Sequence, residues 1–76
     1  MAEEKKILIK DEFIKLGQAM KLAGLADSGI MAKEVIQNGE VLVNGEKETR
    51  RGKKIYPGDS FSYKGMNVKV DKVNAC

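Results

Sequence analysis

The densest group of charged side chains lies between residues 47 and 54, where the sequence is KETRRGKK. Five of these eight residues are cationic and one is anionic. Arginine offers a planar fork of donors and lysine a mobile point charge, and both suit phosphate oxygens. Gly52 has no side chain and lets the backbone approach an anion closely. The segment is a candidate polyanion-binding surface; the alternative is a solvated loop that only aids solubility.

A second set of polar side chains lies on the exposed faces of two predicted helices. An ordinary amphipathic helix surface would have the same appearance, so this set is weaker on its own. Its members are Lys15, Gln18, Lys21, Ser28, Lys33 and Gln37.

The sequence lacks the residues that most enzyme mechanisms need. It contains no histidine, and its single cysteine, Cys76, has no histidine partner to activate it as a nucleophile. Clusters of metal-ligating residues and glycine-rich phosphate motifs are also absent. We therefore predict that the chain is not an enzyme and uses no cofactor, metal or small-molecule substrate.

Length and composition indicate one small folded unit. The chain has 76 residues and a net charge of +3, and all of this excess comes from residues 39–76. No apolar run approaches the ~20 residues of a membrane span, so we expect a cytoplasmic monomer that does not bind membranes. We expect a single domain over residues 1–76, with a core in residues 12–72 and frayed ends at residues 1–6 and 73–76.

The hydrophobic pattern predicts two short helices. Apolar or small residues recur with helical spacing at Phe13, Leu16, Gly17 and Met20, which predicts a helix over residues 12–23. Asp27 or Ser28 can cap a second helix, which ends at Asn38-Gly39.

The second half alternates with a period of two, as in strands. Asn44-Gly45 predicts a tight hairpin between Val41–Val43 and a return strand over residues 46–49. Pro57-Gly58 indicates a turn before a last hairpin over residues 60–70. Residues 7–9 form a first strand or an extended arm. The fold class is α+β, with two short antiparallel helices packed on a small antiparallel or mixed sheet.

The order of these elements resembles the S4 RNA-binding domain. The matching stretch runs from Lys15 to Phe61 and includes the hairpin sequence Val-Leu-Val-Asn-Gly and the turn Gly58-Asp59. Within that family the chain is most similar to free-standing short bacterial S4-like proteins of the YaaA and YbcJ type. The resemblance implies the αL motif and binding of structured RNA, with ribosomal RNA or a ribosomal subunit as the partner.

The resemblance also implies which residues contact RNA. Asn44, Gly45, Gly58 and Asp59 are interpreted as structural turn residues. Two positions depart from the family pattern, Gly17 in place of Asp and Gly29 in place of a basic residue, and they shift the expected binding toward the loop. By position the resemblance implies RNA contacts from Lys15, Ser28, Lys33, Arg50, Arg51, Lys53 and Lys54. The polar helix face and the basic segment add Lys21 and Lys47 to the predicted RNA-binding residues.

Two alternatives stay open. The first is a protein-interaction or adaptor module that docks on an acidic partner. The second, binding of duplex DNA, is disfavoured because the helices are short and carry few side chains able to contact bases. At least three of the four aromatic residues are expected in the core, which favours recognition of phosphate and shape over base stacking. These residues are Phe13, Tyr56, Phe61 and Tyr63.

Overall fold

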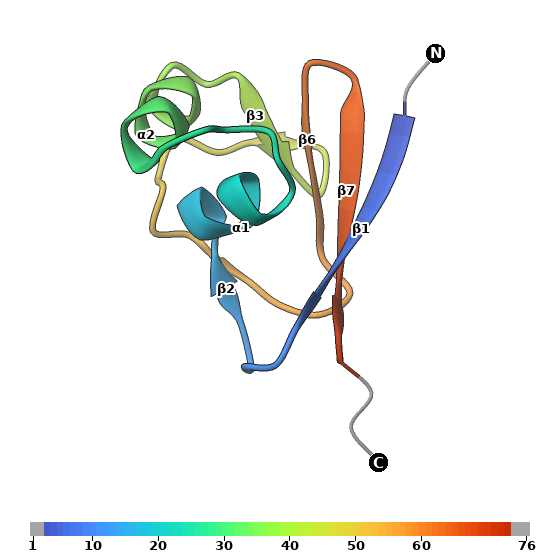
Figure 1. Ribbon diagram of the computed structural model, residues 1–76. Helices are drawn as coiled ribbons and strands as arrows, with labels where there is room; N and C mark the ends of the chain where they lie inside the picture. Colours follow the sequence, from blue (N-terminus) through green and yellow to red (C-terminus); the bar gives the residue numbers. More distant parts are fainter. Residues whose placement is uncertain (1–2, 74–76) are drawn as a thin grey trace.

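The computed structural model describes residues 3–73, in which two helices lie against one face of a sheet (Figure 1). The sheet has five strands in the order β1-β7-β6-β3-β4, and a two-stranded ribbon, β2–β5, lies apart from it. The predicted α+β class is confirmed. In chain order the elements are β1 (Glu3–Ile9), β2 (Ile14–Lys15), α1 (Leu16–Leu22), α2 (Gly29–Gln37), β3 (Val41–Val43), β4 (Glu46–Lys47), β5 (Lys54–Ile55), β6 (Ser60–Tyr63) and β7 (Met66–Lys72).

The two predicted hairpins are present. Asn44 and Gly45 both have positive φ angles, 51° and 85°, as a tight turn between β3 and β4 requires. The β6–β7 hairpin pairs Phe61 with Val68 and Tyr63 with Met66. β4 is shorter than predicted, because the Glu48 carboxylate accepts hydrogen bonds from the following backbone N–H groups and the chain leaves the sheet there.

The core lies between the helices and the sheet. Each helix buries one stripe, and alternate residues of the strands face the same layer. The largest fully buried side chains are Leu16, Met20, Ile36, Val41, Ile55, Phe61, Val68 and Val70.

The beginning of the chain belongs to the sheet. β1 runs parallel to β7 and pairs with it over its whole length, and Ile7 and Ile9 are each 6% exposed. The expectation of frayed residues 1–6 and of a core starting at residue 12 is therefore wrong for Glu3–Ile9. At the other end, the N–H of Val73 donates to the carbonyl of Ile9. Residues 1–2 and 74–76, with Cys76, lie outside the described range.

The first helix is shorter than predicted. It begins at Leu16 instead of residue 12, because Ile14 and Lys15 pair with β5 in the ribbon. Phe13 consequently lies before the ribbon and contributes to no helical face. The second helix agrees with the prediction: Ser28 is its N-cap, and its hydroxyl accepts a hydrogen bond from the N–H of Met31 at 3.2 Å.

Candidate nucleic-acid interface

The basic segment, residues 47–54, is fastened to the start of α1. The first helical N–H groups need acceptors from outside the helix, and the segment supplies two of them. The N–H of Leu16 donates to the carbonyl of Lys53 at 2.9 Å, and that of Gly17 donates to the carbonyl of Arg51 at 3.0 Å. Together with the pairing of β2 and β5, these bonds fix the loop beside the helix. Residues 51–53 of the loop are thus held beside the start of α1.

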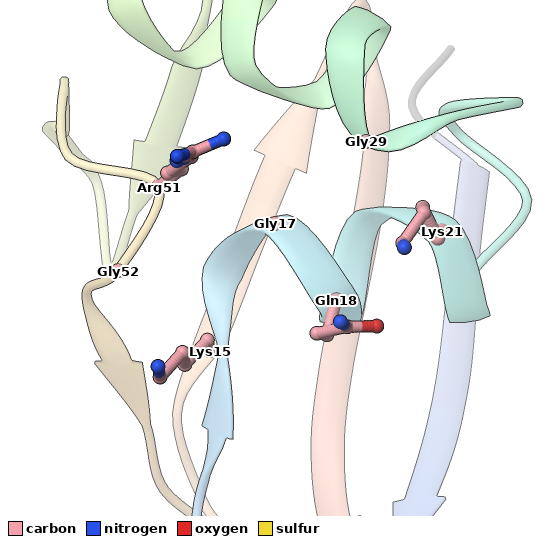
Figure 2. Close-up of a pocket in the computed structure, with 7 residues that line it drawn as sticks. All are labelled: Lys15, Gly17, Gln18, Lys21, Gly29, Arg51 and Gly52. Atoms are coloured by element: carbon pink, nitrogen blue, oxygen red, sulfur yellow. The ribbon is translucent and has the colours of Figure 1, made fainter.

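A surface hollow of about 320 Å³ lies where α1, α2 and the basic segment meet. We call it the α1–loop hollow. Lys15 and Lys21 come from the α1 side, Arg51 comes from the loop, and Gly29 comes from the start of α2 (Figure 2). The residues that line it are Lys15, Gly17, Gln18, Lys21, Gly29, Arg51 and Gly52.

The α1–loop hollow is electropositive. Among the described residues that line it, three are cationic and none is acidic. Within residues 3–73 the structure shows two ion pairs, Lys6–Asp71 and Arg50–Glu48, and neither involves Lys15, Lys21 or Arg51. Lys15 also lies directly opposite Lys54 in the β2–β5 ribbon, and like charges in that position repel. An anion bound there would relieve the repulsion.

Gly17 and Gly29 help to keep the hollow open. A methyl group added to Gly17 would lie 3.6 Å from the Cβ of Arg51, and one added to Gly29 would lie 4.0 Å from the Nζ of Lys21. Longer side chains at these positions would project among the cations. From the sequence, both glycines shift the expected binding from the helices toward the loop, whereas the structure places them in the lining of the hollow.

Lys47, Arg50 and Lys53 lie around a second, polar hollow of about 520 Å³. This β3–β4 hollow also contains Glu46 and Glu48, so its charge is mixed. Its other lining residues are Val43 and Asn44.

Glu48 engages Arg50. The Nε of Arg50 donates to Oε2 of Glu48 at 3.1 Å, and one terminal nitrogen donates to Oε1 at 3.3 Å. The hydrogen bond from the Arg50 side chain is the main cause that lowers the pKa of Glu48, and the same pair raises the pKa of Arg50. Arg50 and Arg51, adjacent in sequence, therefore differ in how much of their charge is already compensated.

The remaining predicted residues are more dispersed. Ser28 lies next to Gly29, with its hydroxyl engaged in capping α2. Lys33 is exposed on α2 and Lys54 is exposed on the ribbon. The structure thus joins Lys15, Lys21 and Arg51 around the α1–loop hollow and leaves Lys33 away from its lining.

The sequence singled out Gly17 and Gly29 as departures from the family pattern but did not place them beside the cations, and it gave no means of separating Arg50 from Arg51. Gln18 was noticed on the polar face of the helices but was not assigned to RNA binding, and it lines the hollow. The glutamate two positions before Arg50 was the available signal for the ion pair.

Asn44 and Asp59 have structural partners, in keeping with their interpretation as turn residues. The Asn44 amide donates to Oδ1 of Asp59 at 3.2 Å, and its oxygen accepts from the N–H of Ser60 at 3.0 Å. Oδ2 of Asp59 accepts from the N–H of Tyr56 at 2.8 Å. These bonds tie the β3–β4 turn to the turn that follows β5.

The family is decided by a match over most of the chain: a model described as the S4 domain matches residues 7–71. The chain belongs to the S4 domain family. A relative from Bacillus subtilis (strain 168), named "Probable ribosome maturation protein RlbA", is 49% identical over 79% of this chain and 84% of its own. Another, "Putative RNA-binding protein YbcJ" of Escherichia coli (strain K12), is 39% identical over 80% of this chain and 87% of its own.

A solved structure shows the same S4 fold. The solution structure of YbcJ from E. coli, described as revealing an αL motif involved in RNA binding, superimposes with a TM-score of 0.65 at 34% identity. The match covers 93% of this chain and 89% of that one. The predicted S4 fold with its αL motif, and the similarity to short bacterial proteins of the YbcJ type, are confirmed.

Neither α1 nor α2 is long and apolar enough to cross a membrane. Over residues 3–73, no group of three or more acidic, cysteine or histidine side chains is placed to hold a metal ion.

Proposed function

We propose that this S4 protein binds structured RNA without catalysing a reaction, and that the α1–loop hollow holds the RNA backbone. The observation that carries the proposal is the convergence of Lys15, Lys21 and Arg51, three cations without a carboxylate partner among the described residues, around one hollow. Cations that neutralise RNA phosphates release the counterions condensed on the RNA, and this release favours binding. The names of RlbA and YbcJ support the same class of ligand.

Ribosomal RNA, encountered during ribosome maturation, is the partner we propose within that class. The support is the printed name of RlbA, the relative that is 49% identical to this chain. We propose that the protein acts as a cytoplasmic monomer in which Lys53 and Lys54 extend the positive surface beyond the hollow. A neutralisation of four to five phosphates gives a slope of log K on log salt of about −3.6 to −4.5 on a duplex, or a gentler slope on single strands.

The test is a titration of labelled RNA hairpins at several salt concentrations. It compares the wild type with a triple variant, Lys15→Ala, Lys21→Ala and Arg51→Ala. We expect the variant to bind more weakly and with a shallower salt dependence, because it neutralises fewer phosphates. A wild-type slope near zero would exclude binding through phosphates.

A matched control removes the same net charge elsewhere. Lys64, Lys69 and Lys72 lie on or beside β7, outside the α1–loop hollow. Changing these three to Ala should leave RNA affinity close to that of the wild type. Equal losses in the two triple variants would mean that the net charge matters and the hollow does not.

Co-sedimentation with ribosomal particles tests the partner. If the wild type travels with a subunit or precursor and the hollow variant stays at the top of the gradient, ribosomal RNA is supported. If the wild type binds hairpins but no particle, the RNA is a different one. If it binds neither, an acidic protein partner becomes the better hypothesis.

A further inference from the structure

The outward face of the β2–β5 ribbon carries two rings and two cations. In the ribbon Ile14 pairs with Ile55 and Lys15 pairs with Lys54. Side chains alternate along a strand, so the two isoleucines face the core while the two lysines face outward. The next position of the same alternation places Phe13 and Tyr56 on the side of the lysines.

The measured contacts agree with this alternation. The ring centroids of Phe13 and Tyr56 are 5.8 Å apart, with their planes tilted by 48°. The Nζ of Lys54 lies 4.9 Å from the centre of the Phe13 ring, as in a cation–π contact. Phe13 is half-buried and Tyr56 is 46% exposed, so these two aromatic residues lie outside the core, contrary to the sequence expectation.

The Tyr56 ring is exposed on a fixed backbone. The backbone N–H of Tyr56 donates to the carboxylate of Asp59 at 2.8 Å, and the backbone carbonyl of Tyr56 accepts from the N–H of Asp59 at 2.9 Å. Phe13 supports the ring from one side. A preorganised ring loses little conformational entropy when a ligand stacks on it.

The ring pair is continuous with the α1–loop hollow. Lys15 lines that hollow and also belongs to the outward face of the ribbon, two residues after Phe13. A phosphate held by Lys15 and Lys54 would therefore bring its own nucleotide next to the rings. Aromatic side chains beside a basic groove are the usual means by which proteins stack unpaired bases.

We propose that Tyr56, supported by Phe13, is a base-stacking subsite for one unpaired nucleotide whose phosphate is held by Lys15 and Lys54. This inference rests on the proposed function and narrows its ligand class to RNA with a bulged or single-stranded nucleotide beside the contacted backbone. A continuous A-form duplex keeps its bases stacked inside and offers none to Tyr56.

The experiment compares two RNA hairpins that differ by a single bulged nucleotide, a fluorescent adenine analogue, which the fully paired hairpin lacks. Affinities are measured for the wild type, Tyr56→Ala, Tyr56→Leu and Tyr56→Phe, with unfolding curves for each. We expect the wild type to prefer the bulged hairpin and to quench the analogue. Loss of the ring should weaken binding of that hairpin at least about fivefold, while Tyr56→Phe retains both the affinity and the quenching.

The outcomes separate the two proposals. If the wild type binds both hairpins equally, or if Tyr56→Leu keeps the preference, stacking is refuted while RNA binding stands. If the wild type binds neither hairpin, the proposed function fails, and the inference fails with it. Leu42→Ala, at an exposed apolar residue on β3, is the matched control and should bind like the wild type. Tyr56→Leu retains apolar volume, so it tests the loss of the aromatic ring even if Tyr56→Ala unfolds.

Discussion

Arg50 and Arg51 are neighbours in the chain, yet we expect them to contribute unequally to RNA binding. Arg51 lines the α1–loop hollow, and it is in neither ion pair that the structure shows within residues 3–73. Arg50 lies at the β3–β4 hollow, where two hydrogen bonds to the Glu48 carboxylate already satisfy part of its guanidinium. A phosphate must displace that carboxylate before it gains the full interaction with Arg50.

The expected difference can be estimated. Hydrogen bonds to a charged group contribute ~1.5–3 kcal/mol, so Arg51→Ala should weaken binding about 10- to 150-fold. Removing one phosphate contact should also make the slope of log K on log salt shallower by about 0.9 on a duplex. Arg50→Ala removes a compensated, 72% exposed side chain, and we expect a change of about twofold.

Fluorescence anisotropy with one RNA hairpin measures both quantities across a salt series. Glu48→Gln is the informative companion, because it releases Arg50 from a charged partner while keeping the shape of the side chain. We expect Glu48→Gln to bind RNA slightly more tightly than the wild type. We also expect Arg50→Ala to weaken RNA binding more in the Glu48→Gln variant than in the wild type. If Arg50→Ala weakens binding as much as Arg51→Ala, the α1–loop hollow does not contribute more to RNA binding than the β3–β4 hollow, and the reasoning is wrong.

Three further predictions concern stability. Hydrogen bonds from Arg50 lower the pKa of Glu48 in the folded protein. Ionised Glu48 therefore contributes to the free energy of unfolding above its ordinary pKa of about 4.3, and this contribution is lost as the pH falls through the lowered folded-state pKa. Urea midpoints measured against pH should show this loss in the wild type and not in Glu48→Gln. Ile7→Ala should cost about 2–5 kcal/mol of unfolding free energy, whereas Leu8→Ala, at a residue 53% exposed, should cost little; equal effects in urea titrations would contradict the packing of β1. Ser28→Ala should cost about 1 kcal/mol in the same assay through loss of the α2 cap, with Ser28→Asn as a control that retains it.

Local signals in the sequence predicted those parts of the fold that depend on neighbouring residues. The Asn44-Gly45 hairpin needs two positive φ angles, and the cap of α2 needs an oxygen at Ser28, so a few letters suffice for each. The S4 family resemblance added the overall arrangement. What could not be predicted depends on partners far away in the chain. β1 was ambiguous because its partner β7 lies at the other end, and α1 was predicted too long because β5 removes residues 14–15 from it.

The candidate site, like the fold, could be predicted from the sequence only where it depends on local patterns. The clustering of cations in residues 47–54 identified the basic segment, and the polar helix face suggested Lys15 and Lys21. Their meeting with Arg51 depends on backbone hydrogen bonds between α1 and residues 51–53, which no local pattern encodes. The expectation that at least three aromatic residues lie in the core was wrong, because Tyr56 follows the buried Ile55 and the alternation of the ribbon turns it outward.

The parallel pairing of β1 with β7 affects the order in which the domain can assemble. Contacts between distant segments form late, because the intervening chain must first be ordered. On a ribosome that adds ~5–20 residues per second, the helices and β3 emerge while Ile7 and Ile9 still lack their neighbour strand. A chain interrupted before residue 66 would therefore present an unpaired apolar strand, a target for chaperones and proteases, and completion of β7 would be the step that closes the sheet.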